Sequence, residues 1–357
     1  VMSGCRGQGC ALSRGGSFAH PTVQPAGANG SIMDIMLYDV MGKPLWMWAL
    51  FIAIVLALLV IDLGLFHKKS REIGVKESLL LSAFYIGLGL AFGGWVWWQS
   101  GQQAGVEYLT GFVVEKSLAM DNVFVIAMIF SYFAIPKVYQ HRVLLYGILG
   151  VIILRGIMIA AGAAVVQNFG WVLYIFAAFL IFTGIKMLMS ADSHYDVANN
   201  PVLKFMKRRF PFTEKLHGEK FFVKEPDATG KMRSVMTPLF LALVLVEFAD
   251  LIFAVDSIPA IFAITTDPFI VYTSNIFAIL GLRALYFALA AMIDRFVYLK
   301  YALSLVLIFI GSKIFVADML GLAKIPPMMS LTITLGILAA GIVGSLWATR
   351  EKTVTKA

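Results

Sequence analysis

Long apolar runs follow one another along most of this chain, separated by short polar segments. Nine of them approach or exceed the roughly 20 residues that a membrane-spanning helix needs. The runs cover 45–66, 77–99, 106–134, 142–165, 170–190, 236–264, 270–293, 296–316 and 327–349. Several connections are only a few residues long, so helical hairpins are an alternative at those boundaries. The pattern predicts an all-α, polytopic membrane protein with about nine transmembrane helices.

The composition strengthens the membrane assignment. Hydrophobic residues make up 60% of the 357 residues and charged residues only 14%, whereas soluble domains are about half apolar and a quarter charged. We therefore expect one transmembrane domain over 42–350, followed by a short cytoplasmic tail over 351–357. A soluble domain of useful size is excluded.

Residues 1–41 differ in kind from the rest of the chain. They are rich in Gly, Ser and Ala, and they lack the apolar stretch of about 7–15 residues that defines a signal peptide. Both cysteines, Cys5 and Cys10, lie in this tail. A redox or metal-binding tail is one interpretation. The one we favour is a disordered tail, or a chain whose natural start is Met33 or Met36. A thiolate site inside the membrane is excluded, because no cysteine follows residue 10.

Basic residues are distributed unevenly between the segments that connect the spans. If the segment after the first span is cytoplasmic, the inner segments hold 20 Lys and Arg residues and the outer segments hold 4. This bias predicts an N-terminus outside the cell and a C-terminus in the cytoplasm. The formal net charge of +8 is therefore mainly a topology signal. Binding of nucleic acid is not expected, because the basic residues are spread over many loops.

The segment 191–234 is the longest polar connection between spans, and we expect it on the cytoplasmic side. Its part at 221–233 has a turn-rich centre between two short ends of apolar or mixed character. A small β-hairpin and a disordered connector are both open alternatives for this part.

Two acidic clusters inside the apolar runs resemble each other. The first is VEKSLAMDNVF, which begins at Val114, and the second is VEFADLIFAVDSIPA, which begins at Val246. Each is followed by a span with a central arginine and then by a span with a Gly-x-Lys motif. The pattern predicts a repeated unit of three helices, with repeat 1 over about 106–190 and repeat 2 over about 236–316.

The repeat also predicts how the two units are oriented. Three is an odd number, so the second unit must cross the membrane in the opposite sense, and the basic residues give the same answer. Inverted repeats with polar sites near the bilayer midplane are a common plan of secondary transporters. We therefore expect a polar site where the two units meet.

A charged side chain at bilayer depth costs at least about 2.5–3.5 kcal/mol, so a chain that carries such acids twice is expected to use them. The candidate metal ligands are Glu115, Asp121, Asn122, Glu247, Asp250, Asp256 and Ser257, with Asp62, Ser117 and Asn275 as accessory candidates. All offer hard oxygen atoms, and none of the five histidines falls within a span. Oxygen ligands suit Mg, Ca and Mn. The residues therefore predict a site for a hard or borderline divalent cation, without ranking these metals.

Four basic residues inside the spans are candidates for charge compensation: Arg155, Arg283, Lys186 and Lys313. The two arginines lie near the middle of their spans. We expect them to neutralise the acids, either as fixed counter-charges or as switches that replace a departed cation. A purely structural ion pair is the alternative. Both lysines lie within about one turn of a span end, so reaching out to the interface explains them equally simply.

Helix geometry limits how many of the acids can meet. Asp256 lies about 180° around its helix from Glu247, and Asp121 lies about 120° from Glu115. The acids of one continuous helix therefore cannot all point at one ion. Pro259 removes a backbone hydrogen bond from the second acidic span. We therefore expect broken or kinked acidic helices, with two tilted, continuous helices as the alternative.

Two further function classes can be weighed from the residues. The sequence contains no GxSG, no HExxH and no Gly-x-Gly-Asp at a membrane aspartate, so an intramembrane enzyme is not expected. A cluster of carboxylates also offers a route for protons, which makes exchange of metal for protons a hypothesis. The oligomeric state stays open.

These motifs resemble the TerC family of integral membrane proteins, and specifically its Alx branch. The resemblance is carried by EKSLAMDNVFV at 115–125, TSNIFAILGLRALYF at 273–287 and the longer runs at 130–159 and 246–271. It covers about residues 45–350 and leaves the N-terminal tail outside the family pattern. The family's acidic motifs map onto Glu115, Asp121, Asn122, Asp250, Asp256 and Ser257.

The resemblance implies a bacterial inner-membrane protein that exports Mn²⁺, with Mn²⁺ as the transported ion and no prosthetic group. Manganese and the direction of export come from the resemblance alone. The family name derives from tellurite resistance, and the Alx branch has also been labelled a redox modulator. A redox modulator or tellurite-resistance protein that acts without metal transport is therefore the alternative. The lack of Cys and His in the spans argues against direct redox chemistry and leaves an indirect effect through metal supply.

Overall fold

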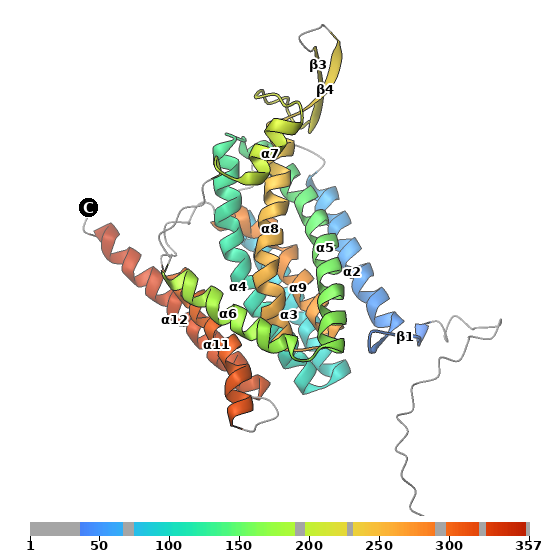
Figure 1. The fold of residues 1–357 in the computed structure, drawn as a ribbon, viewed down its shortest axis with the longest axis vertical. Helices are drawn as coiled ribbons and strands as arrows, with labels where there is room; N and C mark the ends of the chain where they lie inside the picture. Colours follow the sequence, from blue (N-terminus) through green and yellow to red (C-terminus); the bar gives the residue numbers. More distant parts are fainter. Residues whose placement is uncertain are drawn as a thin grey trace, which may run out of the picture.

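Helices form nearly all of the regular structure in the computed structural model of this chain, which describes residues 36–66, 75–189, 197–226, 231–289, 298–320 and 326–354. Cys5, Cys10 and most of the expected N-terminal tail lie outside them. The helices are α2 (Leu45–Phe66), α3 (Val75–Ser100), α4 (Gln102–Tyr132), α5 (Lys137–Asn168), α6 (Val172–Met189), α7 (Pro201–Arg209), α8 (Pro238–Phe262), α9 (Pro268–Leu280), α10 (Leu282–Leu289), α11 (Leu299–Met319) and α12 (Pro327–Val354). Most lie side by side in one bundle, and α6, α11 and α12 form a slanted group on its flank (Figure 1).

Seven segments of the described residues are helical, long and apolar enough to cross a membrane. They are α3, α5, α6, α8, α11, α12 and the pair α9–α10 taken together. α4 is 31 residues long, but it carries Glu107, Glu115, Lys116 and Asp121. The apolar stretch described for α2, Leu45–Ile61, is shorter than the others. The predicted all-α, multi-pass membrane fold is confirmed, and the count of nine spans stays a prediction.

A helix break occurs in this bundle, but not in the acidic spans. α4 and α8 each run without interruption, so the expectation that these helices are broken is wrong, whereas a kink in either of them stays a prediction. Pro259 stands in the last turn of α8, so the backbone hydrogen bond that it removes lies near the end of the helix. The break falls at Gly281, between α9 and α10. An added Cβ there would lie 2.8 Å from Cβ of Tyr85, so α3 packs closely against the break.

The helices of the two predicted units pack against one another reciprocally. The first helix of each unit contacts the second helix of the other, α4 with α9 and α8 with α5, and the third helices, α6 and α11, pack together. An ideal Cβ on Gly184 would lie 2.7 Å from Cγ1 of Ile308, and one on Gly311 would lie 2.6 Å from the carbonyl oxygen of Ala177. The Gly-x-Lys motifs therefore mark a close helix contact. This arrangement accords with an inverted repeat, which stays a prediction.

Small β-structures stand at the two ends of the bundle. β3 (Phe222–Pro226) and β4 (Met232–Met236) pair as an antiparallel hairpin, so the hairpin is the correct alternative for 221–233. β1 (Asp39–Val40) pairs with β2 (Lys43–Pro44) at the opposite end (Figure 1). The hairpin and α7 share the end that the basic residues predict to be cytoplasmic.

α2 and α3, which lie outside the predicted repeats, pack on the bundle through aromatic side chains. Phe92 of α3 packs on Phe277 of α9 with ring centroids 4.6 Å apart, and the ring of Phe51 in α2 lies 5.8 Å from the same phenyl ring. Offset and edge-to-face contacts of this kind add to the stability gained by burial. The first two helices therefore form a hydrophobic layer against α9.

Candidate functional site

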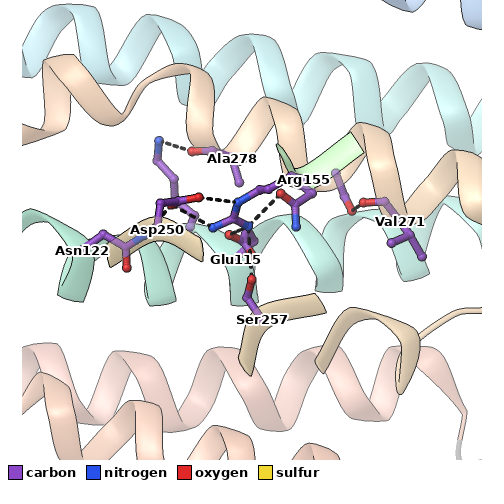
Figure 2. A network of polar contacts seen from close by, with 10 residues as sticks. Glu115, Asn122, Arg155, Asp250, Ser257, Val271 and Ala278 are labelled. Atoms are coloured by element: carbon purple, nitrogen blue, oxygen red, sulfur yellow. Dashed lines mark hydrogen bonds and ion pairs between the residues drawn. The ribbon is translucent and has the colours of Figure 1, made fainter. Parts of the chain in front are cut away.

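Arg155 of α5 lies at the centre of a buried polar network, with only 1% of its surface exposed. Its Nη1 donates hydrogen bonds to a carboxylate oxygen of Glu115, to Oγ of Ser257 at 3.1 Å and to Oδ1 of Asn275 at 2.8 Å. Its Nε and Nη2 donate to the two carboxylate oxygens of Asp250, each at 3.2 Å. Figure 2 shows the guanidinium pointing between Glu115 and Asp250.

Four helices, α4, α5, α8 and α9, supply this network. We call it the Arg155 cluster, and its members are Arg155, Glu115, Asn122, Asp250, Ser257 and Asn275. Glu115 and Asn122 are seven residues apart in α4, and Asp250 and Ser257 are seven apart in α8. Seven residues are two helical turns, so each pair shares one face of its helix. The amide nitrogen of Asn122 donates to Asp250 at 3.2 Å and links the two faces.

The Arg155 cluster holds unbalanced charge and unused polar capacity. Two carboxylates face one guanidinium, which leaves a formal charge of −1 on the cluster. Burying charges is costly, and the bidentate contact with Asp250 offsets part of that cost. Within the described part of the chain, Oε2 of Glu115, Oδ1 of Asn122 and Nδ2 of Asn275 are buried and make no hydrogen bond.

The other two predicted ligands of α8 lie outside the Arg155 cluster, although Glu247 is close enough to Asp250 to interact with it electrostatically. Glu247 lies one turn before Asp250, in a space left by Gly150 of α5, where an added Cβ would collide with its Oε1. Asp256 faces α6, and its Oδ1 accepts a hydrogen bond from Thr183 at 3.2 Å. The helix arithmetic therefore holds for α8, because its acids do not converge on one point.

Three more predicted residues can be placed only in part or have other roles. The side chains of Asp121 and Asp62 lie outside the described residues, although both positions are helical. The hydroxyl of Ser117 donates to the backbone oxygen of Val113 at 2.7 Å, so it is engaged within its own helix. Among the described residues, no group of three or more His, Cys, Asp or Glu side chains is arranged to hold a metal.

The remaining basic candidates occupy three different places. Arg283 is buried and lines a cavity of about 20 Å³ together with Asn122 and Asp250, next to the Arg155 cluster. Lys186 lies close enough to Asp256 to interact with it electrostatically. Lys313 lies near the end of α11, and its Nζ is 3.3 Å from Oγ of Ser330.

Comparison with known proteins decides the family. Residues 100–353 match the model described as "Integral membrane protein TerC family". The chain belongs to the TerC family. An "Uncharacterized membrane protein STKORF319" of Myxococcus xanthus is 46% identical over 311 residues, which are 87% of this chain and 95% of that protein. A "Putative membrane-bound redox modulator Alx" of Photorhabdus laumondii is 45% identical over 320 residues, 87% and 97% of the two chains. No solved structure matches the chain.

One buried residue of this TerC family member was missed by the sequence reasoning. Lys116 of α4 is buried, and its Nζ donates to the carbonyl oxygen of Ala278 at 2.9 Å, in the last turn of α9 (Figure 2). A cation suits the carbonyl end of a helix, so Lys116 caps α9 just before the break at Gly281. The sequence does indicate a buried partner for Lys116, because a lysine beside Glu115 in mid-span is too deep to reach the interface.

Proposed function

We propose that this protein transports divalent metal cations across the bacterial inner membrane, with Mn²⁺ as the favoured substrate and efflux as the favoured direction. The Arg155 cluster carries the proposal. Two carboxylates, a hydroxyl and an amide oxygen there surround a cation, the guanidinium of Arg155. A set of groups that holds one cation is chemically suited to hold another.

The charges of the cluster suggest how a metal would enter. Glu115 and Asp250 bring two negative charges, which match a divalent cation, and Arg155 adds one positive charge. Oε2 of Glu115 and Oδ1 of Asn122 are buried without a hydrogen bond within the described residues, so both could join the ligands. We propose that Arg155 is a tethered cation that fills the site in the absence of metal and moves aside when metal binds.

The ligand chemistry favours hard metals. The cluster offers oxygen atoms from carboxylates, an amide and a hydroxyl, and these suit Mg²⁺, Ca²⁺ and Mn²⁺ better than they suit softer metals. Mn²⁺ is preferred among them because of the family resemblance. The redox-modulator name of the Alx relatives would follow if redox chemistry in the cell depended on the supply of this metal.

The acids outside the cluster then have successive roles. Glu247 lies one turn toward the hairpin end from Asp250, and Asp256 faces α6 through Thr183. We propose that they bind the ion before or after the Arg155 cluster and not at the same moment. A carboxylate that has released a metal can take up a proton, so the proposal includes metal–proton exchange.

Flux measurements in proteoliposomes test the proposed function. Purified protein is reconstituted with a metal-sensitive dye and, in parallel, a pH dye in the lumen, and Mn²⁺, Ca²⁺ and Mg²⁺ are added outside. We expect Mn²⁺ flux with opposite proton flux, and loss of both in Asp250→Asn. Glu219→Gln is the matched control, because Glu219 also pairs with an arginine, Arg142, but at a partly exposed position.

Three results would reject parts of this proposal. No flux of any of the three metals by the wild-type protein would remove the transport function. Metal flux that is equal in Asp250→Asn and Glu219→Gln would remove the Arg155 cluster as the site and leave transport in place. Metal flux without proton movement would remove the coupling alone.

A further inference from the structure

A cavity of about 270 Å³ lies where α4 begins and where α8 and α11 end. This is the end of the bundle opposite the β3–β4 hairpin, which the basic residues predict to be the outer side. Its polar lining includes Glu107, Thr110, Thr265, Lys313, Asp318 and Ser330. Exposed residues of its wall, among them Asp318 and Thr266, connect the cavity with the surface.

A thin layer of packed residues separates this cavity from the Arg155 cluster. Glu107 and Glu115 are eight residues apart in α4, which places them about 12 Å apart along the helix axis and about 80° apart around it. Gly111 stands between them. An added Cβ on Gly111 would lie 3.0 Å from Oγ of Ser274 and 3.6 Å from Cγ2 of Ile261. α4, α8 and α9 therefore close the short path between the two carboxylates.

The charges in the cavity favour a weak cation site. Glu107 is only 7% exposed, and its Oε1 accepts a hydrogen bond from Gln103 at 2.9 Å. Its buried negative charge attracts cations strongly, because little water screens it. Lys313 lines the same cavity, and its positive charge opposes that attraction. Glu107, Asp318 and Lys313 together leave a formal charge of −1.

We propose that this cavity is a second binding site for divalent cations, a vestibule in which Glu107 receives the ion after it leaves the Arg155 cluster. Lys313 keeps the binding weak, so the ion is released to the outside. The packed contacts of Gly111 form the gate between the two sites. This inference rests on the proposed transport function for its role, but binding in the vestibule can be measured without transport.

Cysteine labelling tests the vestibule directly. The only two cysteines, Cys5 and Cys10, are first replaced by serine in the full-length chain. Ala317→Cys then places a thiol in the cavity wall. Ala302→Cys is the matched control, since Ala302 lies in the same helix, is also buried and does not line the cavity. A charged, water-soluble methanethiosulfonate reagent should modify Cys at 317 much faster than at 302.

Protection by Mn²⁺ then tests the ligand assignment. Mn²⁺ should slow the labelling of Ala317→Cys. Glu107→Gln should raise the Mn²⁺ concentration needed for half protection by about tenfold, and Lys313→Gln should lower it, because one unit charge changes in each case. These opposite shifts would not arise from a general loss of structure.

Three outcomes would overturn the inference. Equal labelling at 317 and 302 would mean that water does not fill the cavity, as expected if a lipid chain occupies it. Labelling without Mn²⁺ protection, or protection unaffected by Glu107→Gln, would remove the cation site. Because this readout needs no flux, protection in a protein that fails to transport would instead reject the transport proposal and keep the site.

Discussion

Replacing Arg155 by methionine should destabilise the protein strongly while keeping most of the packing volume. The change would leave Glu115 and Asp250 buried without the guanidinium that now binds both. Removing one partner of a buried ion pair costs about 3–5 kcal/mol. Arg142→Met is the matched control, because the Arg142–Glu219 pair is 32% and 36% exposed and such surface pairs contribute about 0–1 kcal/mol. The two variants should therefore differ by at least about 2 kcal/mol in unfolding free energy.

The assay is unfolding in mixed detergent micelles, followed by the fluorescence of the seven tryptophans. Mn²⁺ should restore part of the lost stability in Arg155→Met, since the divalent cation can take the place of the guanidinium between the two carboxylates. It should change Arg142→Met no more than the wild type. Equal destabilisation of the two variants would refute the ion-pair reasoning. Equal stabilisation of both variants by Mn²⁺ would refute the idea that Arg155 is a tethered cation.

Two further predictions concern helix packing and the separate acid of α8. Gly311→Ala should lower the unfolding free energy by about 1–3 kcal/mol, because the added Cβ would press on the carbonyl oxygen of Ala177; Gly336→Ala, with open space around it, should not. Asp256→Asn should lower Mn²⁺ flux in proteoliposomes but change stability by less than about 1 kcal/mol, since the amide oxygen can still accept from Thr183. Unchanged flux in that variant would exclude Asp256 as a ligand.

The faces of the acidic helices and a polar site where the two units meet could be predicted from the sequence, but the pairing of residues within that site could not. The spacing of seven residues between Glu115 and Asn122 predicts one shared face, and the structure places both in the Arg155 cluster. Arg155 and Arg283 are equivalent in the sequence pattern. Which of them donates to Asp250 depends on how α5 packs against α8, and no local pattern encodes that packing.

The position of the helix break shows the same limit. Proline is the strongest local signal for a break, so Pro259 was the natural candidate. The structure keeps Pro259 in the last turn of α8 and breaks the chain at Gly281, where Tyr85 packs from α3 and Lys116 caps from α4. The position of the break therefore depends on tertiary contacts with residues more than a hundred positions away in the sequence. The hairpin at 221–233, in contrast, is local, and its turn-rich centre was enough to make the hairpin one of two alternatives, beside a disordered connector.

The contact between α6 and α11 bears on how such a protein could move. At Gly184 and Gly311 the two helices approach closely, and each glycine lies against backbone atoms and an isoleucine side chain of the other helix, Ile308 and Ile181 respectively. Interlocked large side chains resist sliding because interiors are close-packed. The two glycines offer no side chain to interlock, which lowers the resistance of this contact to shear. The molecule thus combines a helix contact on its flank that favours sliding with a hydrogen-bonded polar network at its centre, the Arg155 cluster. If one half rocked against the other, the hydrogen bonds of the Arg155 cluster would have to break, whereas the contact between α6 and α11 would only have to slide.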